Sequence, residues 1–322
     1  MRASLPAVHY FGGVELGIAV PVSGSWATVD NVVQVATRAE ELGYRSLWTM
    51  QRLLSPPDGS WGEAYRSVLD PVVTLSYLAA RTTRVRLSVA VINMPFYAPA
   101  LLAKQLATAD LLSGGRVDAG LGIGWSDEEY AAVGVDKARR GKRADEYVPL
   151  LRRLWSDDVV DHDGEFYRVP ASRMDPKPTQ VGGPPILLGG AAEPALRRAG
   201  RIADGWISSS RTDLTTIGAS VRVVRAAAER AGRDPDRLRM VCRGVVLVRP
   251  DQAAGADRRP LTGTVEQIRG DFAGLAEQGV TELFIDLNFD PTIGTPDADP
   301  AASMAHAESV LTAFAPSFNR AR

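Results

Sequence analysis

The sequence predicts a single α/β domain, a (β/α)8 TIM barrel that covers residues 1–322 and carries an insertion after its fourth strand. Apolar strand-like runs alternate with amphipathic helical patterns eight times along the chain. An open doubly wound sheet rarely continues this alternation so far, whereas a barrel requires it. The alternation breaks at about residues 127–183, where Asp163-Gly164 resembles a hairpin turn. We assign this stretch to an insertion and not to a second domain.

The first three strand–helix pairs are marked by caps and by glycine or proline. Thr28 is placed to cap a helix that Gly43 ends, and Asp70 precedes a helix that begins at Pro71. Pro99 begins the third helix. The predicted strands are residues 16–22, 46–50 and 85–92, and a long loop covers residues 51–65. Loops of that length in a compact domain are usually functional or mobile.

The second half of the chain is predicted from apolar runs and from one capping box. Thr264 and Gln267 form the capping-box pattern ahead of a helix. Strands are expected at 117–123, 185–188, 206–208, 239–248 and 282–289, and helices at 141–155, 194–203, 214–228, from 264 onward and at 301–315. The carboxyl ends of barrel strands meet at one mouth, so we look for the site there.

Composition argues against several classes of function. The net charge of −1 gives no electrostatic reason to expect nucleic acid or an anionic membrane as a partner. Cys242 is the only cysteine, so no disulfide can form within the chain and a reducing compartment fits best. We find neither a signal peptide nor an 18-residue apolar segment, and therefore expect a cytoplasmic protein. The three histidines lie away from the strand ends, which argues against a histidine triad or metal site.

Two of the candidate site segments follow the fourth and fifth strands. Gly189-Gly190 precede a predicted helix, where converging backbone N–H groups suit a phosphate, although glycine is also common in plain turns. Asp127 is the first carboxylate after the fourth strand and is a candidate acid or base. The run from Asp127 to Glu129 is equally typical of the acidic first turn of a helix.

Four other candidates also have a structural alternative. Arg52 is placed to bind an anionic group or polarise a carbonyl, or to form a structural ion pair. Trp48 and Trp125 are candidates to pack on a flat ring, but aromatic residues near barrel ends are more often core. Asp286 alternates with apolar residues on the last strand and is expected to point into the barrel, where it is either functional or a buried structural carboxylate.

Seven short motifs stand in an order and spacing specific to one superfamily. They are SLWTMQR at 46–52, LLSGGR at 111–116, LGIGW at 121–125, DGEF at 163–166, PILLGG at 185–190, ADGW at 203–206 and LFIDLNFDP at 283–291. Together they resemble the bacterial luciferase-like monooxygenase superfamily, in particular its branch of coenzyme F420-dependent oxidoreductases. The set is much less specific to one cofactor or substrate.

The resemblance implies a barrel that binds F420 (a deazaflavin) or FMN at its carboxyl-end mouth, with a non-prolyl cis peptide at Ala90–Val91 behind the cofactor ring. Asn93 matches a position that contacts the ring, residues 189–192 match a phosphate loop, and Asp127 matches an acidic catalytic residue of the sugar-phosphate dehydrogenase subgroup. The expected cofactor-binding residues are Ala90, Val91, Asn93, Gly122, Gly124, Trp125, Gly189, Gly190, Ala191 and Ala192; the expected substrate pocket holds Trp48 and Gln51; the expected catalytic residues are Asp127 and Arg52.

The sequence departs from that subgroup at the second strand. Gln51 and Arg52 stand where the subgroup has an Asp-His pair, so the histidine base is missing. The clear counterparts of the lysines that bind the substrate phosphate are missing as well. Sugar phosphates are therefore not expected as substrates.

These residues and the resemblance lead to three functional hypotheses. The first is hydride transfer between F420 and a small organic substrate, with Asp127 or Arg52 acting on the substrate and the cofactor doing the redox chemistry. The second is an FMN-dependent monooxygenase that uses O2 and reduced flavin from a separate reductase. The third is a non-catalytic flavin- or deazaflavin-binding protein. In each case the resemblance implies a homodimer.

Overall fold

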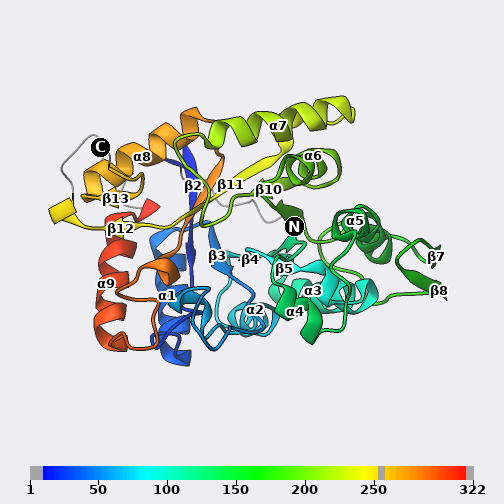
Figure 1. Ribbon diagram of the computed structural model, residues 1–322, viewed down its shortest axis with the longest axis horizontal. Helices are drawn as coiled ribbons and strands as arrows, with labels where there is room; N and C mark the ends of the chain where they lie inside the picture. Colours follow the sequence, from blue (N-terminus) through cyan, green and yellow to red (C-terminus); the bar gives the residue numbers. More distant parts are fainter. Residues whose placement is uncertain (1–9, 253–257, 317–322) are drawn as a thin grey trace.

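The computed structural model describes residues 10–252 and 258–316 and confirms the predicted (β/α)8 barrel (Figure 1). Within these ranges, eight parallel strands close into a ring, and each pairs with two neighbours. Around the ring they are β2 (Val14–Ala19), β3 (Ser46–Thr49), β4 (Arg86–Val89), β6 (Val117–Gly122), β9 (Ile186–Gly189), β10 (Gly205–Ile207), β11 (Arg239–Gly244) and β14 (Glu282–Ile285), which pairs with β2 again. All eight carboxyl ends therefore face one mouth.

Helices surround the strands and begin and end largely where the caps predict. They are α1 (Val29–Leu42), α2 (Pro71–Ala79), α3 (Pro99–Ser113), α6 (Glu193–Ile202), α7 (Ile217–Arg230), α8 (Val265–Glu277) and α9 (Pro300–Ala313) (Figure 1). Thr28 caps α1, whose last turn ends at Gly43 with a φ of 84°. The capping box of Thr264 and Gln267 is present at α8. In the described part of the chain, no helix has the length and apolar character needed to cross a membrane.

The segment between β6 and β9 consists of two helices and a hairpin. These are α4 (Asp127–Ala132), α5 (Arg140–Ser156) and the antiparallel pair β7 (Val160–Asp163) and β8 (Arg168–Ser172). Glu146 on α5 holds the hairpin by accepting hydrogen bonds from the backbone N–H groups of Phe166 and Tyr167, both at 2.9 Å. Trp155 ties α5 to α3 by donating to the Ala103 carbonyl at 3.0 Å.

Several strands end earlier than the sequence predicts. The predicted strand 239–248 divides into β11 and β12 (Leu247–Val248), and β12 pairs with β13 (Thr262–Gly263) outside the barrel. The predicted strand 282–289 ends at Ile285, because the Asp286 carboxylate accepts the Asn288 N–H and turns the chain into a short 3-10 helix. The predicted strand 85–92 is interrupted after Val89, and β5 (Ile92–Asn93) then pairs with β6.

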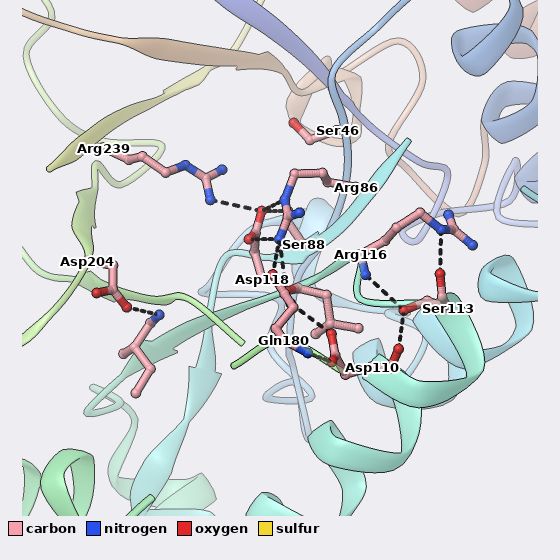
Figure 2. Close-up of polar contacts among 12 residues, drawn as sticks. Ser46, Arg86, Ser88, Asp110, Ser113, Arg116, Asp118, Gln180, Asp204 and Arg239 are labelled. Atoms are coloured by element: carbon pink, nitrogen blue, oxygen red, sulfur yellow. Dashed lines mark hydrogen bonds and ion pairs between the residues drawn. The ribbon is translucent and has the colours of Figure 1, made fainter. Parts of the chain in front are cut away.

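Charged side chains close the amino-terminal end of the barrel (Figure 2). Asp118 is fully buried and pairs with Arg86 at 2.5 Å and with Arg239 at 3.0 Å. Arg239 also pairs with Glu282 at 2.6 Å. Burial alone would raise the pKa of Asp118. The positive charges of Arg239 and Arg86 outweigh burial, so the pKa of Asp118 lies below its usual value. We call Asp118, Arg86, Arg239 and Glu282 the Asp118 network. Nearer the mouth, Trp48 stacks on Phe284 with ring centroids 4.4 Å apart.

Candidate functional site

A cavity of about 430 Å³ opens at the carboxyl-terminal mouth of the barrel. Its size is typical of a small-molecule or cofactor site. The structure brings together most of the residues predicted from the sequence. The cavity is lined by all ten expected cofactor-binding residues and also by Gln51 and Arg52. Trp48 and Asp127 are not among its lining residues.

The floor of the cavity is a valine packed against glycine. The Ala90–Val91 peptide bond is cis, as the family resemblance implies. A Cβ on Gly122 would lie 2.5 Å from Cγ2 of Val91, and a Cβ on Gly189 would lie 3.0 Å from Cγ1. Both glycines are therefore needed for the close approach of Val91, and together the three residues give a smooth apolar surface.

Gln51 and Asn93 join the ends of β3 and β5 beside this floor. The Asn93 N–H donates to Oε1 of Gln51 at 2.8 Å, and Nε2 of Gln51 donates to the Tyr97 hydroxyl at 2.8 Å. Nδ2 of Asn93 is buried and has no hydrogen-bond partner within the protein. A buried amide donor without an acceptor is costly, so this group is available for a ligand acceptor atom such as a ring carbonyl.

The part of the cavity at the start of α6 is suited to an anion. Gly190 has a φ of 144°, which side-chain-bearing residues rarely adopt, and its carbonyl accepts a 2.8 Å hydrogen bond from Nε1 of Trp206. Helix α6 follows at once, and no side chain caps its N-terminus. Arg140 lines the same cavity. Glu193, which could oppose an anion here, is exposed and pairs with Arg197 instead.

Arg52 lies in a buried cage of aromatic rings. Its side chain is 6% exposed and pairs with the fully buried Glu129 at 3.3 Å. The guanidinium carbon lies 4.8–5.4 Å from three ring centroids, those of Trp61, Tyr65 and Trp125. Burial lowers the pKa of Arg52, and the Glu129 carboxylate opposes that effect. Nη1 of Arg52 has no hydrogen-bond partner within the protein.

A second buried ion pair, which was not predicted from the sequence, lies beside the cavity floor at Ala90 and Val91. Arg243 on β11 pairs with Asp286 at 2.6 Å and donates from Nη1 to the Ala90 carbonyl at 3.3 Å. Arg243 is therefore the partner that the sequence left open for Asp286. An available signal was a charged residue inside the apolar run 240–246, at a strand's carboxyl end.

Two candidates lie outside the cavity, and the structure favours their structural alternatives. Trp48 is fully buried inside the barrel, stacked on Phe284, and Nε1 donates to Ser46 at 2.8 Å. The Asp127 side chain is 83% exposed, pairs with Lys137 at 2.7 Å and stands in the acidic first turn of α4. The structure thus brings Arg52, but not Asp127, to the cavity.

Fold and site together define the class of protein as a (β/α)8 barrel whose mouth holds a cavity with an apolar floor and, at the start of α6, a geometry that suits an anion. The chain belongs to the luciferase-like monooxygenase family, whose model matches residues 12–282. Both F420-dependent and FMN-dependent enzymes are found among its relatives.

Three similar proteins illustrate this range. The F420-dependent hydroxymycolic acid dehydrogenase of Mycobacterium tuberculosis is 29% identical over 244 residues, which cover 74% of this chain and 64% of the relative. The FMNH2-dependent dimethylsulfone monooxygenase of Pseudomonas putida is 34% identical over 164 residues, covering 50% of this chain and 45% of the relative. The crystal structure of monooxygenase RslO1 from Streptomyces bottropensis matches with a TM-score of 0.77 at 23% identity, covering 94% and 98% of the two chains, and supports the fold.

Proposed function

We propose that the protein is an oxidoreductase that transfers a hydride between coenzyme F420 and a small organic substrate. The observation that carries this proposal is the cavity itself, with its floor at Val91, an unpartnered amide donor on Asn93 and an anion-binding end at α6. The similarity to an F420-dependent dehydrogenase over 74% of the chain supports the choice of cofactor.

The residues present fit a deazaflavin with its phosphate. The ring would lie against Val91, with a ring carbonyl near Nδ2 of Asn93, and the phosphate would bind the backbone of residues 189–192 with Arg140. The bound cofactor would donate or accept the hydride. The protein's own part is to hold the ring, exclude water and place the substrate beside Gln51 and Arg52.

A flavin monooxygenase that uses O2 and reduced FMN from a separate reductase is the second candidate. It is favoured by the similarity to an FMNH2-dependent monooxygenase. The same floor and the same phosphate end would also accept FMN. In either case we propose a cytoplasmic homodimer that acts on small molecules and binds neither nucleic acid nor membrane.

A paired fluorescence titration tests the cofactor. The full chain is titrated with F420 and with FMN, each oxidised and reduced. Micromolar or tighter binding of F420 with weak FMN binding is expected. The reverse preference would replace the proposal by the FMN monooxygenase, and binding of neither would reject both.

A matched pair of glycine variants locates the binding. Gly122→Ala places a methyl group against Val91, so we expect cofactor binding at least about tenfold weaker. Gly270→Ala on α8 is the control, because a Cβ there meets nothing within 4 Å. Equal affinities for the two variants would place the cofactor elsewhere.

A further inference from the structure

The charged side chains that line the cavity are all cationic. Three of its lining residues are charged, and all three are arginines: Arg52, Arg140 and Arg243. Among the described residues, no aspartate, glutamate, histidine, lysine or cysteine lines this cavity. Arginine has five N–H donors and no acceptor, and it does not deprotonate in proteins. The charged groups can therefore stabilise negative charge but cannot remove a proton from a substrate.

Gln51 and Glu129 do not supply a base beside Arg52. Both polar atoms of the Gln51 side chain are already used, one by Asn93 and one by Tyr97. The Glu129 carboxylate is fully buried, accepts from the Leu53 N–H at 2.7 Å and pairs with Arg52, and it does not line the cavity. Glu129 therefore fixes the charge of Arg52 and holds its position without meeting the substrate.

The aromatic cage fixes Arg52 in advance of any ligand. Three rings and one carboxylate hold the guanidinium, while Nη1 lacks an acceptor. A preorganised cation in a site that excludes water is worth most where negative charge develops during a reaction. The same stabilisation serves both directions of hydride transfer, because carbonyl reduction and alcohol oxidation pass through one transition state.

We propose that Arg52 is a catalytic residue that stabilises negative charge developing on a substrate oxygen, and that the protein interconverts carbonyl compounds such as ketones and conjugated enones with the corresponding alcohols. This inference rests on the proposed function. The substrate carbon gains a hydride from the reduced cofactor, and the π electron pair moves onto the oxygen beside Arg52. That oxygen then takes a proton from water. The reduced cofactor would supply that hydride to the carbon and release one proton to solvent, so one carbonyl group and two hydrogens give one alcohol.

The substrate class is tested first with the F420-loaded chain. Reduced F420 is mixed with a panel of ketones and enones without O2, and oxidised F420 with the matching alcohols. Turnover is expected with both sets. Binding of F420 without turnover of either set would overturn the inference alone, whereas failure to bind F420 in the titration would overturn the proposed function and this inference with it.

The role of Arg52 is tested with two variants, because removing it alone leaves the Glu129 charge buried. Arg52→Lys keeps a charge, and Arg52→Met with Glu129→Gln removes both charges. We expect kcat/KM for carbonyl reduction to fall about 10²–10³-fold in the double variant, as for loss of one oxyanion donor, and less in Arg52→Lys. Arg66→Met is the control, since Arg66 is an exposed arginine of the same loop that pairs with Glu63.

Anion binding gives a readout independent of turnover. Benzoate, a flat carboxylate, is titrated into each F420-loaded protein by calorimetry, and the affinity for F420 is measured beside it. Wild type and Arg66→Met should bind benzoate, and the double variant should bind it at least about tenfold more weakly with unchanged F420 affinity. Equal benzoate affinity and equal kcat/KM in the double variant and wild type would overturn the role of Arg52.

Discussion

At the scale of single residues, the two buried arginines of the mouth perform different tasks. Arg52 lies among aromatic rings and has one unpartnered donor, whereas the Arg243 guanidinium is committed to Asp286, the Ala90 carbonyl and the Met50 sulfur. A guanidinium with all its contacts inside the protein is suited to hold a neighbouring segment in place. Arg243 is therefore a positioning residue for the cavity floor.

Removal of Arg243 should destabilise the fold. Arg243→Met leaves the carboxylate of Asp286, which is 1% exposed, without its cation. Loss of one partner of a buried ion pair costs about 3–5 kcal/mol, so the free energy of unfolding should fall by that amount in urea denaturation. Adding Asp286→Asn removes the stranded charge and should recover part of the loss. A single variant as stable as wild type would contradict this account.

Replacement of Asp127 should leave catalysis unchanged. Its side chain is 83% exposed and pairs with Lys137 outside the cavity, and exposed ion pairs contribute little. We expect kcat/KM of Asp127→Asn to stay within about twofold of wild type, since surface changes away from a site are usually small. A drop as large as that predicted for the Arg52 double variant would show that the carboxylate reaches the substrate during turnover.

The sequence identifies cavity residues well where the backbone makes the site. Gly122 and Gly189 can be predicted because glycine at a strand end signals a close approach, and the cis bond follows from the family resemblance. Side-chain partners are harder to predict, because Arg52 and Glu129 stand 77 positions apart and meet only when the loop after β3 and helix α4 fold together over the mouth. No spacing rule relates such residues.

At the scale of elements, helix ends are more predictable than strand ends. A cap acts within one turn, so Thr28, Asp70 and Thr264 mark the starts of α1, α2 and α8 from local sequence. A strand ends where its neighbours stop pairing with it. The apolar run 239–248 therefore gives no sign that β11 leaves the barrel at Gly244 and that the chain pairs next with β13.

The Asp118 network at the amino-terminal end of the barrel makes the free energy of unfolding depend on pH in the acidic range. The pKa of Asp118 in the folded protein is lowered, so its contribution is complete above the usual aspartate pKa of about 4 and is lost as the pH falls further. Asp118→Asn should lower the free energy of unfolding by about 3–5 kcal/mol at neutral pH, because Arg86 and Arg239 lose a shared carboxylate.

Urea denaturation across a series of pH values measures this effect. The difference between wild type and Asp118→Asn should be constant from neutral pH down to about pH 4 and should shrink below it, because the unfolded chain then binds a proton at Asp118 that the folded protein, with its lowered pKa, does not yet bind. Asp127→Asn serves as the control, since that exposed carboxylate should show no comparable difference at any pH. A difference that grows on acidification would contradict the assignment.

At the scale of the whole molecule, the exposed face of α2 and α3 is the strongest candidate for contact between subunits. The two helices pack beside each other (Figure 1). Val73 and Tyr77 on α2 are 70% and 37% exposed, and Leu101 and Leu112 on α3 are 53% and 66% exposed. Each pair has helical spacing, so each lies on one side of its helix. Apolar residues gathered on adjacent helices are typical of a protein–protein contact.

We therefore expect the homodimer to form through this face. Leu101→Lys combined with Leu112→Lys places two charges in the contact and should convert the dimer to a monomer in sedimentation velocity, since charges are depleted from interface cores. Val181→Lys is the control, because Val181 is a fully exposed apolar residue outside α2 and α3. The cavity is lined by neither helix, so cofactor affinity should survive in the monomer. If the wild-type protein is a monomer, there is no such contact. If the double lysine variant remains a dimer, the contact lies on another face.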